Sequence, residues 1–208
     1  ATYNLVYSAK DLLGNSGALL KGSTYFIVDT VAPGAPRALN WSGAAAGKVI
    51  LTWSGALGES AAGYCIYRAG TKLLCQPAAG GGETYSDTPA ADGYYDYSVS
   101  AVDKAGNESA AASVSAYSDA TPPAAPAALA AAAASESGIV VSWTAGAGDA
   151  PAGFRLYRST SPIISPAGMA YRTLVGTQYT DQPAGDGVYY YALTAVDAVG
   201  NESAITAA

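Results

Sequence analysis

The chain repeats itself, and this repetition limits the folds open to it more than any other feature does. Trp53 and Trp143 lie 90 residues apart in the similar segments VILTWSG and IVVSWTA, and GYCIYR and GFRLYR follow them at the same spacing. Further on, AVDKAGNES and AVDAVGNES lie 94 residues apart. Similarity at a fixed spacing indicates tandem modules, here of about 90 residues each. The change in spacing predicts a four-residue insertion in the second copy, between Arg158 and Tyr179.

The repeats divide the chain into one partial and two full modules. Residues 1–33 resemble only the end of a copy, because YNLVYSAKDLLGN near their start matches YDYSVSAVDKAGN in the first full copy. The first full module spans residues 34–121, and the second spans residues 122–208 and has an incomplete last strand. The proline-containing links 32–36 and 121–126 favour extended backbone, so we expect an elongated chain of modules.

The residue pattern of each module predicts β-strands. Tyr95, Tyr97 and Val99 fall on one face of a segment in which polar residues occupy the positions between them. One buried face and one wet face are typical of an antiparallel sheet. Roughly seven such short strands in about 90 residues predict an all-β chain built of β-sandwiches.

The alanine-rich segment Ala130–Ala134 leaves an alternative open, since alanine is the best helix former. The matching positions of the first module hold Asn40-Trp41-Ser42-Gly43, at the same distance before the tryptophan. Because repeated modules share one fold, the sequence favours a strand and a turn over a helix.

Further motifs recur in both modules. A tryptophan ends one strand, a Gly-aromatic-x-aliphatic-Tyr-Arg strand follows, and Tyr-x-Tyr-x-Val/Leu-x-Ala-x-Asp-x-x-Gly-Asn-Glu-Ser comes near the end. Over residues 34–208 these motifs resemble the fibronectin type III modules of bacterial surface and secreted proteins. The opening piece, residues 1–33, with YFIVDTVAP at 25–33, is similar to the closing hairpin of a bacterial Ig-like module, of which it would hold the last two strands. The resemblance implies tandem Ig-like or fibronectin type III β-sandwiches, arranged like beads on a string. It transfers no catalytic residue and no single function.

Composition excludes several classes of function. The chain has no histidine, which removes Ser-His and Cys-His nucleophile pairs and histidine metal sites. Its net charge is −6 and its Lys and Arg do not cluster, so we expect no nucleic acid partner. No apolar run of about 18 residues occurs, so we expect no membrane insertion. We therefore expect no catalytic residue, no metal, no cofactor and no enzyme activity in this stretch.

The segment Asp-x-x-Gly-Asn occurs three times. The copies are Asp103, Gly106 and Asn107; Asp197, Gly200 and Asn201; and Asp11, Gly14 and Asn15. Calcium binding is one interpretation, because Asp and Asn supply oxygen ligands, but one carboxylate and one amide cannot fill the roughly six to eight positions around calcium. We favour a turn in which the glycine has a positive φ and the carboxylate accepts backbone N–H groups. Two of the copies continue as Asn-Glu-Ser, which also matches a glycosylation acceptor, a pattern that is common by chance.

Cys65 and Cys75 flank a predicted hairpin. If residues 69–71 form a three-residue loop, Arg68 faces Lys72 and Cys65 faces Cys75. Facing residues of this kind come close enough for a cross-strand disulfide. Two free thiols are the alternative.

The environment of the cysteines follows from the second module. There Arg155 takes the place of Cys65, so we expect this position to point to solvent. A disulfide would indicate an oxidising compartment, and we therefore expect the chain to be secreted or on the cell surface.

Tyrosine is abundant, with 16 in the chain. Where tyrosines are neighbours in a strand, their rings face opposite sides of the sheet. We expect Tyr94 and Tyr190 to face outward as amphipathic contact surface. Sugar stacking is one interpretation of these rings, and packing between sheets or modules is the other.

Function follows from the sequence only as a class. The leading hypothesis is a non-catalytic, extracellular structural or adhesive repeat region in a surface stalk, an adhesin or a filament. The alternative is an accessory spacer, or carbohydrate-contacting modules, of a secreted polysaccharide-degrading enzyme. A third hypothesis is recognition of a glycan or host surface through exposed tyrosines.

The partial first module predicts a partner of its own. A lone hairpin is marginal in water, and the alternating residues Tyr3, Leu5 and Tyr7 need an opposing sheet. We expect residues 1–30 to pair with polypeptide outside this segment. That polypeptide would be a neighbouring module of a longer array, or a neighbouring subunit joined by strand addition.

Overall fold

The computed structural model describes residues 2–4, 25–27, 29–55, 60–134, 138–148 and 150–207. Every regular element in these ranges is a β-strand, as the alternating pattern predicts. None of the described residues belongs to a helix long and apolar enough to cross a membrane. Strands β1 (Thr2–Asn4) and β2 (Tyr25–Ile27) pair antiparallel in a two-stranded sheet. The rest of the predicted hairpin, with the turn copy at residues 11–15, lies outside the described residues.

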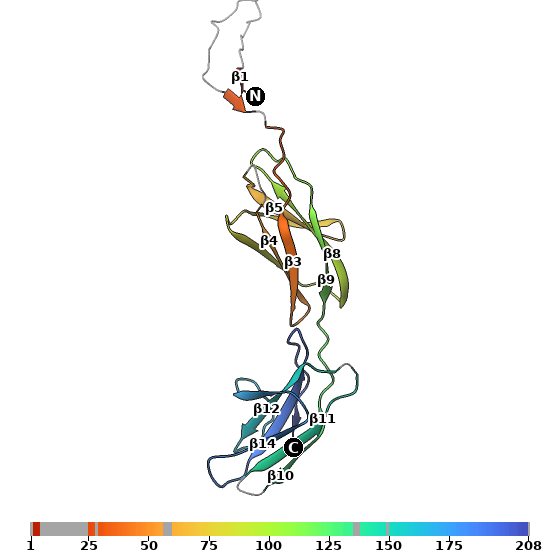
Figure 1. Ribbon diagram of the computed structural model, residues 1–208, viewed down its shortest axis with the longest axis vertical. Helices are drawn as coiled ribbons and strands as arrows, with labels where there is room; N and C mark the ends of the chain where they lie inside the picture. The colour runs from red at the N-terminus through yellow and green to blue at the C-terminus, as the bar shows by residue number, and fades with distance from the viewer. Residues whose placement is uncertain are drawn as a thin grey trace, which may run out of the picture. The chain divides into compact units, whose positions relative to one another are not determined.

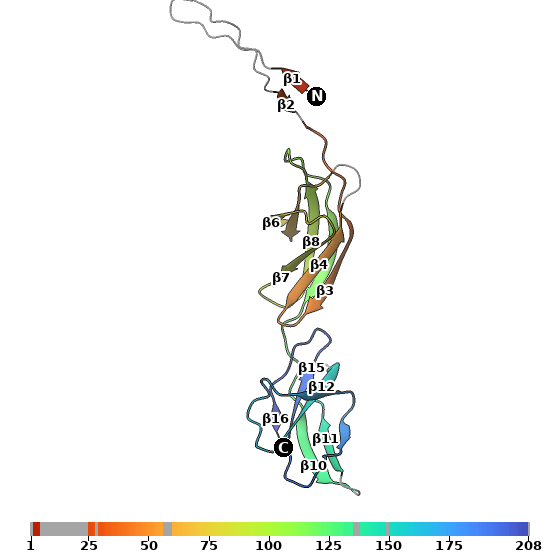
Figure 2. The same ribbon diagram turned by 90° about the vertical axis from the view of Figure 1, so that its left-hand side faces the viewer.

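The first sandwich combines a three-stranded and a four-stranded sheet (Figures 1 and 2). The strand order is β3-β4-β7 in one sheet and β6-β5-β8-β9 in the other. The bounds are β3 (Arg37–Ala44), β4 (Lys48–Ser54), β5 (Gly63–Arg68), β6 (Thr71–Pro77), β7 (Gly82–Asp87), β8 (Gly93–Val102) and β9 (Ala112–Ser118).

The second sandwich repeats this topology. The strand order is β10-β11-β14 in one sheet and β13-β12-β15-β16 in the other. The bounds are β10 (Ala127–Ala133), β11 (Ile139–Thr144), β12 (Gly153–Ser159), β13 (Tyr171–Leu174), β14 (Gln178–Asp181), β15 (Tyr190–Val196) and β16 (Thr206–Ala207). The short β16 pairs with β15, with Thr206 opposite Leu193 and Ala207 opposite Ala192.

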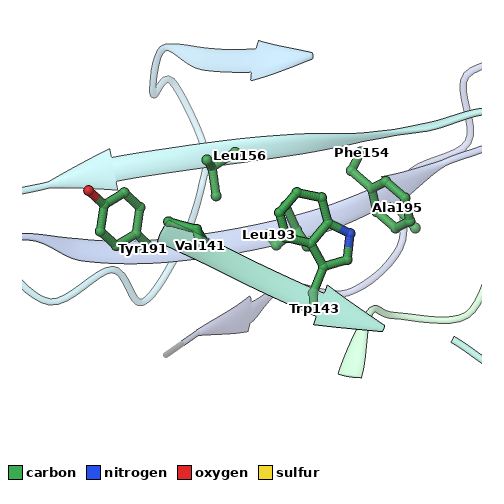
Figure 3. Packing of buried hydrophobic residues seen from close by; sticks show 7 residues of the cluster. All are labelled: Val141, Trp143, Phe154, Leu156, Tyr191, Leu193 and Ala195. Carbon is green, nitrogen blue, oxygen red and sulfur yellow. The ribbon is translucent and has the colours of Figure 1, made fainter. Parts of the chain in front are cut away.

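The core of the second sandwich lies between its two sheets (Figure 3). Its buried members are Val141, Trp143, Phe154, Leu156, Tyr191, Leu193 and Ala195. These core members alternate along β11, β12 and β15, as the period of two predicts. In β15 the intervening Ala192 and Thr194 are buried as well, on the opposite face of the sheet. The rings of Trp143 and Phe154 meet edge to face at 5.5 Å, and Trp53 and Tyr64 repeat the pair at 5.6 Å in the first module. Such aromatic pairs contribute beyond the area they bury.

The alanine-rich segment is a strand. It pairs with β11 from Ala130 opposite Ser142 to Ala133 opposite Ile139. The register shifts just before this stretch, where Ala128 has a φ of 51°, and Ala38 has the same φ at the matching point of the first module. Pairing with β11 therefore overrides the helical preference of alanine.

The prediction of a three-residue loop between β5 and β6 was wrong. The turn has two residues, Ala69 with a φ of 48° and Gly70 with a φ of 75°, so Arg68 pairs with Thr71. Two consecutive left-handed residues give a turn whose twist matches that of the flanking strands, which is why the shorter turn forms.

A bulge in β6 compensates for the shorter turn. Leu73 is the extra residue, because the register shifts by one between the pairs Tyr67–Lys72 and Ile66–Leu74. The shift brings the two cysteines opposite each other, as the sequence predicts.

The insertion of the second module lies between β12 and β13, in the segment 160–170. Ile163 of this segment is buried with Tyr157 and Ala192, and Met169 and Tyr190 pack against them. These residues form a second, small cluster apart from the main core. The first module has only its two-residue turn in this place.

We predict that Ala69→Asn stabilises the first module. Alanine is strained in the left-handed region whereas asparagine tolerates it, so the free energy of unfolding should rise by about 0.5–1 kcal/mol. Calorimetry should show a higher melting temperature for one transition. Ala111→Asn, at an exposed alanine outside the left-handed region, serves as the control and should give no gain. Equal effects of both substitutions would contradict the argument.

Candidate functional site

The repeated Asp-x-x-Gly-Asn segment forms a turn organised by its aspartate. Asp103 and Asp197 each use Oδ1 to accept backbone N–H groups across the turn, at 2.7–2.9 Å. The donors are Ala105 and Asn107 in the first module and Val199, Gly200 and Asn201 in the second. Gly106 and Gly200 have φ values of 92° and 97°, which glycine adopts without strain.

The asparagine of the turn ties it to the chain that precedes the module. Asn107 Nδ2 donates to Asp103 Oδ2 at 2.8 Å and to the backbone carbonyl of Asp29 at 3.0 Å. Asn201 repeats both bonds, at 2.7 Å and 3.0 Å, with the carbonyl of Asp119 as its second acceptor. Hydrogen bonding from Asn107 holds the pKa of Asp103 below its usual range. Because both amide hydrogens are used in each case, these bonds argue against a glycan at either asparagine.

The glutamate after each asparagine gathers hydroxyl groups. In the second module Glu202 accepts hydrogen bonds from the hydroxyls of Tyr157, at 2.7 Å, and Thr194, at 2.5 Å, and it is ion-paired with Arg155. Burial acts to raise the pKa of Glu202, but these hydrogen bonds and the guanidinium outweigh it, and the pKa is lowered.

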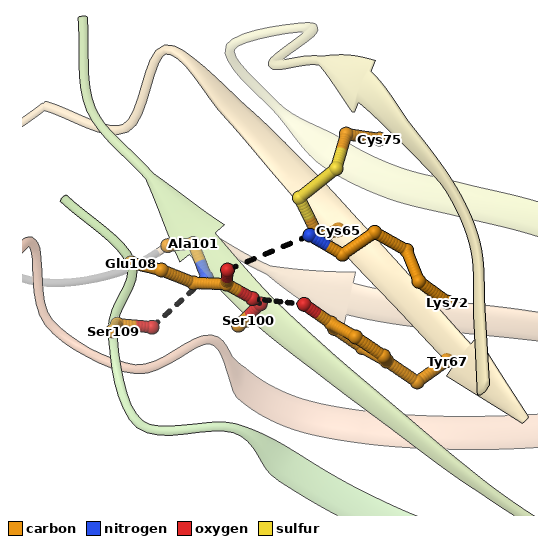
Figure 4. The surroundings of a disulfide bond; sticks show 8 residues. All are labelled: Cys65, Tyr67, Lys72, Cys75, Ser100, Ala101, Glu108 and Ser109. Atoms are coloured by element: carbon orange, nitrogen blue, oxygen red, sulfur yellow. Dashed lines mark hydrogen bonds and ion pairs between the residues drawn. A yellow bond between two sulfur atoms is a disulfide. The ribbon is translucent and has the colours of Figure 1, made fainter. Parts of the chain in front are cut away.

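Glu108 does the same in the first module (Figure 4). It accepts hydrogen bonds from the hydroxyls of Ser100 and Tyr67, and Lys72 Nζ lies 3.6 Å from its carboxylate. The hydrogen bond from Ser100, followed by that from Tyr67, lowers the pKa of Glu108. Both modules have a glutamate, a tyrosine and a serine or threonine at the matching positions of this cluster. This recurrence could have predicted the cluster, which the interpretation of the segment as a turn alone does not include.

The serine that closes the motif fixes the next stretch of chain. Ser109 Oγ accepts the N–H of Ala101 at 2.9 Å, and Ser109 N–H donates to the carbonyl of Ala101 at 2.8 Å. Ser203 makes the same pair of bonds with Ala195, both at 2.9 Å. All four polar residues of the motif are therefore occupied by structural bonds. No group of three or more His, Cys, Asp or Glu that could hold a metal occurs in the part of the chain that the structure describes.

A second polar cluster lines a cavity of about 280 Å³ in the second module. Asp181 accepts two hydrogen bonds from Arg158 Nη1, at 2.8 and 3.0 Å, and one from the hydroxyl of Tyr191 at 2.7 Å. Burial acts to raise the pKa of Asp181. The hydrogen bonds from Arg158 and Tyr191 outweigh this effect, so the pKa of Asp181 is lowered. Burial, together with the bond to Asp181, raises the pKa of Tyr191. A carboxylate kept ionised by three such bonds is a structural anchor and a poor proton donor.

The two cysteines form a disulfide between β5 and β6 (Figure 4). Their Cα atoms lie 4.0 Å apart. The expectation that this position points to solvent is wrong for Cys65, which is only 2% exposed, whereas Cys75 is exposed. The reason is that β5 has a strand on either side, β6 and β8, and a short side chain there is covered by its neighbours.

The two tyrosines singled out as contact surface differ in the structure. Tyr94 is 76% exposed, and its ring lies 4.9 Å from that of Tyr117, which the sequence did not single out. Tyr190 is half-buried, because it packs against the cluster around Ile163. The structure thus pairs Tyr94 with a ring from the next strand and places Tyr190 beside the insertion.

Comparisons with known proteins agree with this architecture. No protein-family model matches the chain. The chain is 33% identical over 225 residues to exoglucanase B of Cellulomonas fimi, and 31% identical over 193 residues to chitinase A1 of Niallia circulans. These alignments cover 99% and 88% of this chain but only 20% and 26% of the two enzymes.

A solved structure shows the same fold. The chicken CNTN1 FN1-FN3 domains match 97% of this chain, and the match covers 74% of that structure, with a TM-score of 0.64. The sequence identity is 15%, so this likeness concerns the fold alone.

We predict that the disulfide stabilises the first module by about 3 kcal/mol. This value follows from the loop-closure entropy of a bridge between residues 10 apart. Reduction followed by alkylation should lower the melting temperature of one calorimetric transition. The second module has no cysteine, so its transition is an internal control. Alkylation without reductant should add no mass, and two adducts would refute the bridge in solution.

Acid should destabilise both modules. The pKa values of Asp103, Glu108, Asp181 and Glu202 are lowered in the folded state. A lowered carboxyl pKa contributes stability at neutral pH that is lost as the pH falls below the usual carboxyl range of about 4 and through the folded pKa. Melting temperatures should therefore be level above about pH 5 and fall below it.

The variant Glu202→Gln tests this origin of the acid sensitivity. It should melt lower than the parent at pH 7 and lose less on acidification, because the titrating carboxylate is gone. The exposed Asp186→Asn is the control and should keep the parental slope. A parental slope for Glu202→Gln would show that acid acts elsewhere.

Proposed function

Since the chain consists of tandem fibronectin type III-like β-sandwich modules related to stretches of an exoglucanase and a chitinase, we propose that it is a non-catalytic accessory region of a secreted polysaccharide-degrading enzyme. The observation that carries the proposal is the alignment of nearly the whole chain with one fifth of the exoglucanase. The chain thus spans about a fifth to a quarter of the two enzymes. Both relatives are named as hydrolases of polysaccharides, so the polymer proposed for this protein is a neutral polysaccharide of the cellulose or chitin class.

The chemistry of the described residues supports a non-catalytic role. Asp181 and Glu202 are bonded to guanidinium and hydroxyl groups, and their lowered pKa values keep them ionised. A glycoside hydrolase needs a carboxylic acid with a raised pKa beside a second carboxylate. The comparisons favour this role over a stalk, an adhesin or a filament, because the two relatives are enzymes.

The disulfide supports secretion, because such bonds persist in oxidising compartments. The pairing of residues 1–30 with polypeptide outside this segment stays part of the proposal. It is supported by the sheet of β1 and β2, which contains no third strand from the described residues.

The test is to find the chain in its natural context. An antibody against residues 34–207 should detect a culture-fluid protein that is larger than 20.7 kDa and forms a clearing zone in a cellulose or chitin gel. The isolated chain, the matched control, should form no clearing zone. Detection only in a cell-attached polymer without hydrolase activity would overturn the proposal and favour a stalk or filament.

A further inference from the structure

The first module carries an uncovered aromatic pair on one sheet. Tyr94 near the start of β8 and Tyr117 near the end of β9 are 76% and 38% exposed. Their ring centroids lie 4.9 Å apart with an interplanar angle of 56°. The two strands are neighbours in the sheet β6-β5-β8-β9. Both tyrosines stand on its outer face, because Tyr97 in β8, and Ala116 and Ser118 in β9, belong to the opposite face and are buried. Two adjoining rings held by paired strands form a surface with little conformational freedom to lose on binding.

The outward positions of β8 and β9 beside the ring pair are polar, while Tyr67 of β5 and Lys72 of β6 lie further along the same face. By the period of two, the outward positions that follow Tyr94 in β8 are Asp96 and Ser98, and those that precede Tyr117 in β9 are Ser115 and Ser113. None of these β8 and β9 positions is aliphatic or basic, and Lys72 is ion-paired with Glu108. A docking site for a protein has an apolar centre that the positions beside the ring pair lack. Rings flanked by hydroxyl and carboxylate groups suit a sugar polymer, whose C–H faces pack on aromatic rings while its hydroxyls form hydrogen bonds.

The second module shows how this chain treats an apolar outer face. At the positions that match Asp96 and Ser98 it has Tyr190 and Ala192, and the insertion covers both through Ile163. The insertion thus covers these two apolar positions, while Val188, which matches Tyr94, stays 69% exposed. The first module has polar residues at the two positions and no insertion, so no such segment covers its ring pair.

We propose that Tyr94 and Tyr117 form a docking surface for an uncharged polysaccharide chain. This inference rests on the proposed function, which supplies the polymer class. Charge favours a neutral polymer over an acidic one, because the protein has a net charge of −6 and Asp96 lies on the same face. Tyr94 supplies the larger exposed ring, and Tyr117 buttresses it from the neighbouring strand.

The experiment is a binding isotherm on insoluble cellulose and on insoluble chitin. The wild-type chain should be retained on at least one of them. The double variant Tyr94→Ala/Tyr117→Ala should bind roughly tenfold or more weakly, because it loses the stacking surface. Tyr94→Phe should keep most of the binding, because the ring remains. Tyr171→Ala, at an exposed tyrosine of the second module, is the matched control and should bind like the wild type.

Several outcomes would overturn the inference. Absence of wild-type binding to both polymers would do so, and so would a double variant that binds like the wild type, or equal loss in the Tyr171→Ala control. Sedimentation showing a wild-type dimer that the double variant lacks would assign the pair to self-association. None of these results would contradict the proposal that the chain is an accessory region of an enzyme, because the culture-fluid experiment tests that proposal separately.

Discussion

The seven-strand sandwiches depend on the carboxylate that closes the loop after β8 and after β15. The aspartate accepts backbone N–H groups, the asparagine reaches the incoming chain, the glutamate collects hydroxyls from two strands and the serine holds the returning strand. One short segment thus joins the loop, the outer face of the sheet and the linker. Buried polar backbone in a loop needs such partners, because an unpaired group would cost about 1–3 kcal/mol.

The sequence predicts the architecture well because the signals for it are repeated. Two copies of each strand pattern place Trp53 and Trp143, the core faces and the site of the insertion. Repetition also corrects a prediction based on helix propensity alone. The alanine-rich segment Ala130–Ala134 is recognisable as a strand only by comparison with the matching segment of the first module. The turn between β5 and β6 was not predictable in the same way. A two-residue turn with a bulge and a three-residue loop give the same facing cysteines, so that pairing cannot distinguish them.

The candidate surface was predicted only in part. Tyr94 is recognisable from alternation along one strand, but its partner Tyr117 belongs to a strand whose register the sequence does not state. Tyr190 has the same alternation, yet the insertion lies against it. Exposure is a property of what else covers a face, and a pattern within a single strand carries no information about that cover. For the same reason the glutamates resemble ordinary turn residues until the tyrosine and threonine hydroxyls are placed around them.

The covered and the open outer face make the two modules unlike, although they share one topology. In the first module a disulfide closes the hairpin of β5 and β6, whereas in the second module the longer segment 160–170 connects β12 and β13. The two connections would respond differently to a protease. A cut between β5 and β6 leaves the two pieces joined through sulfur, whereas a cut in the segment 160–170 separates β12 from β13. Duplicating or exchanging these modules in an engineered protein would therefore change its resistance to digestion as well as its length.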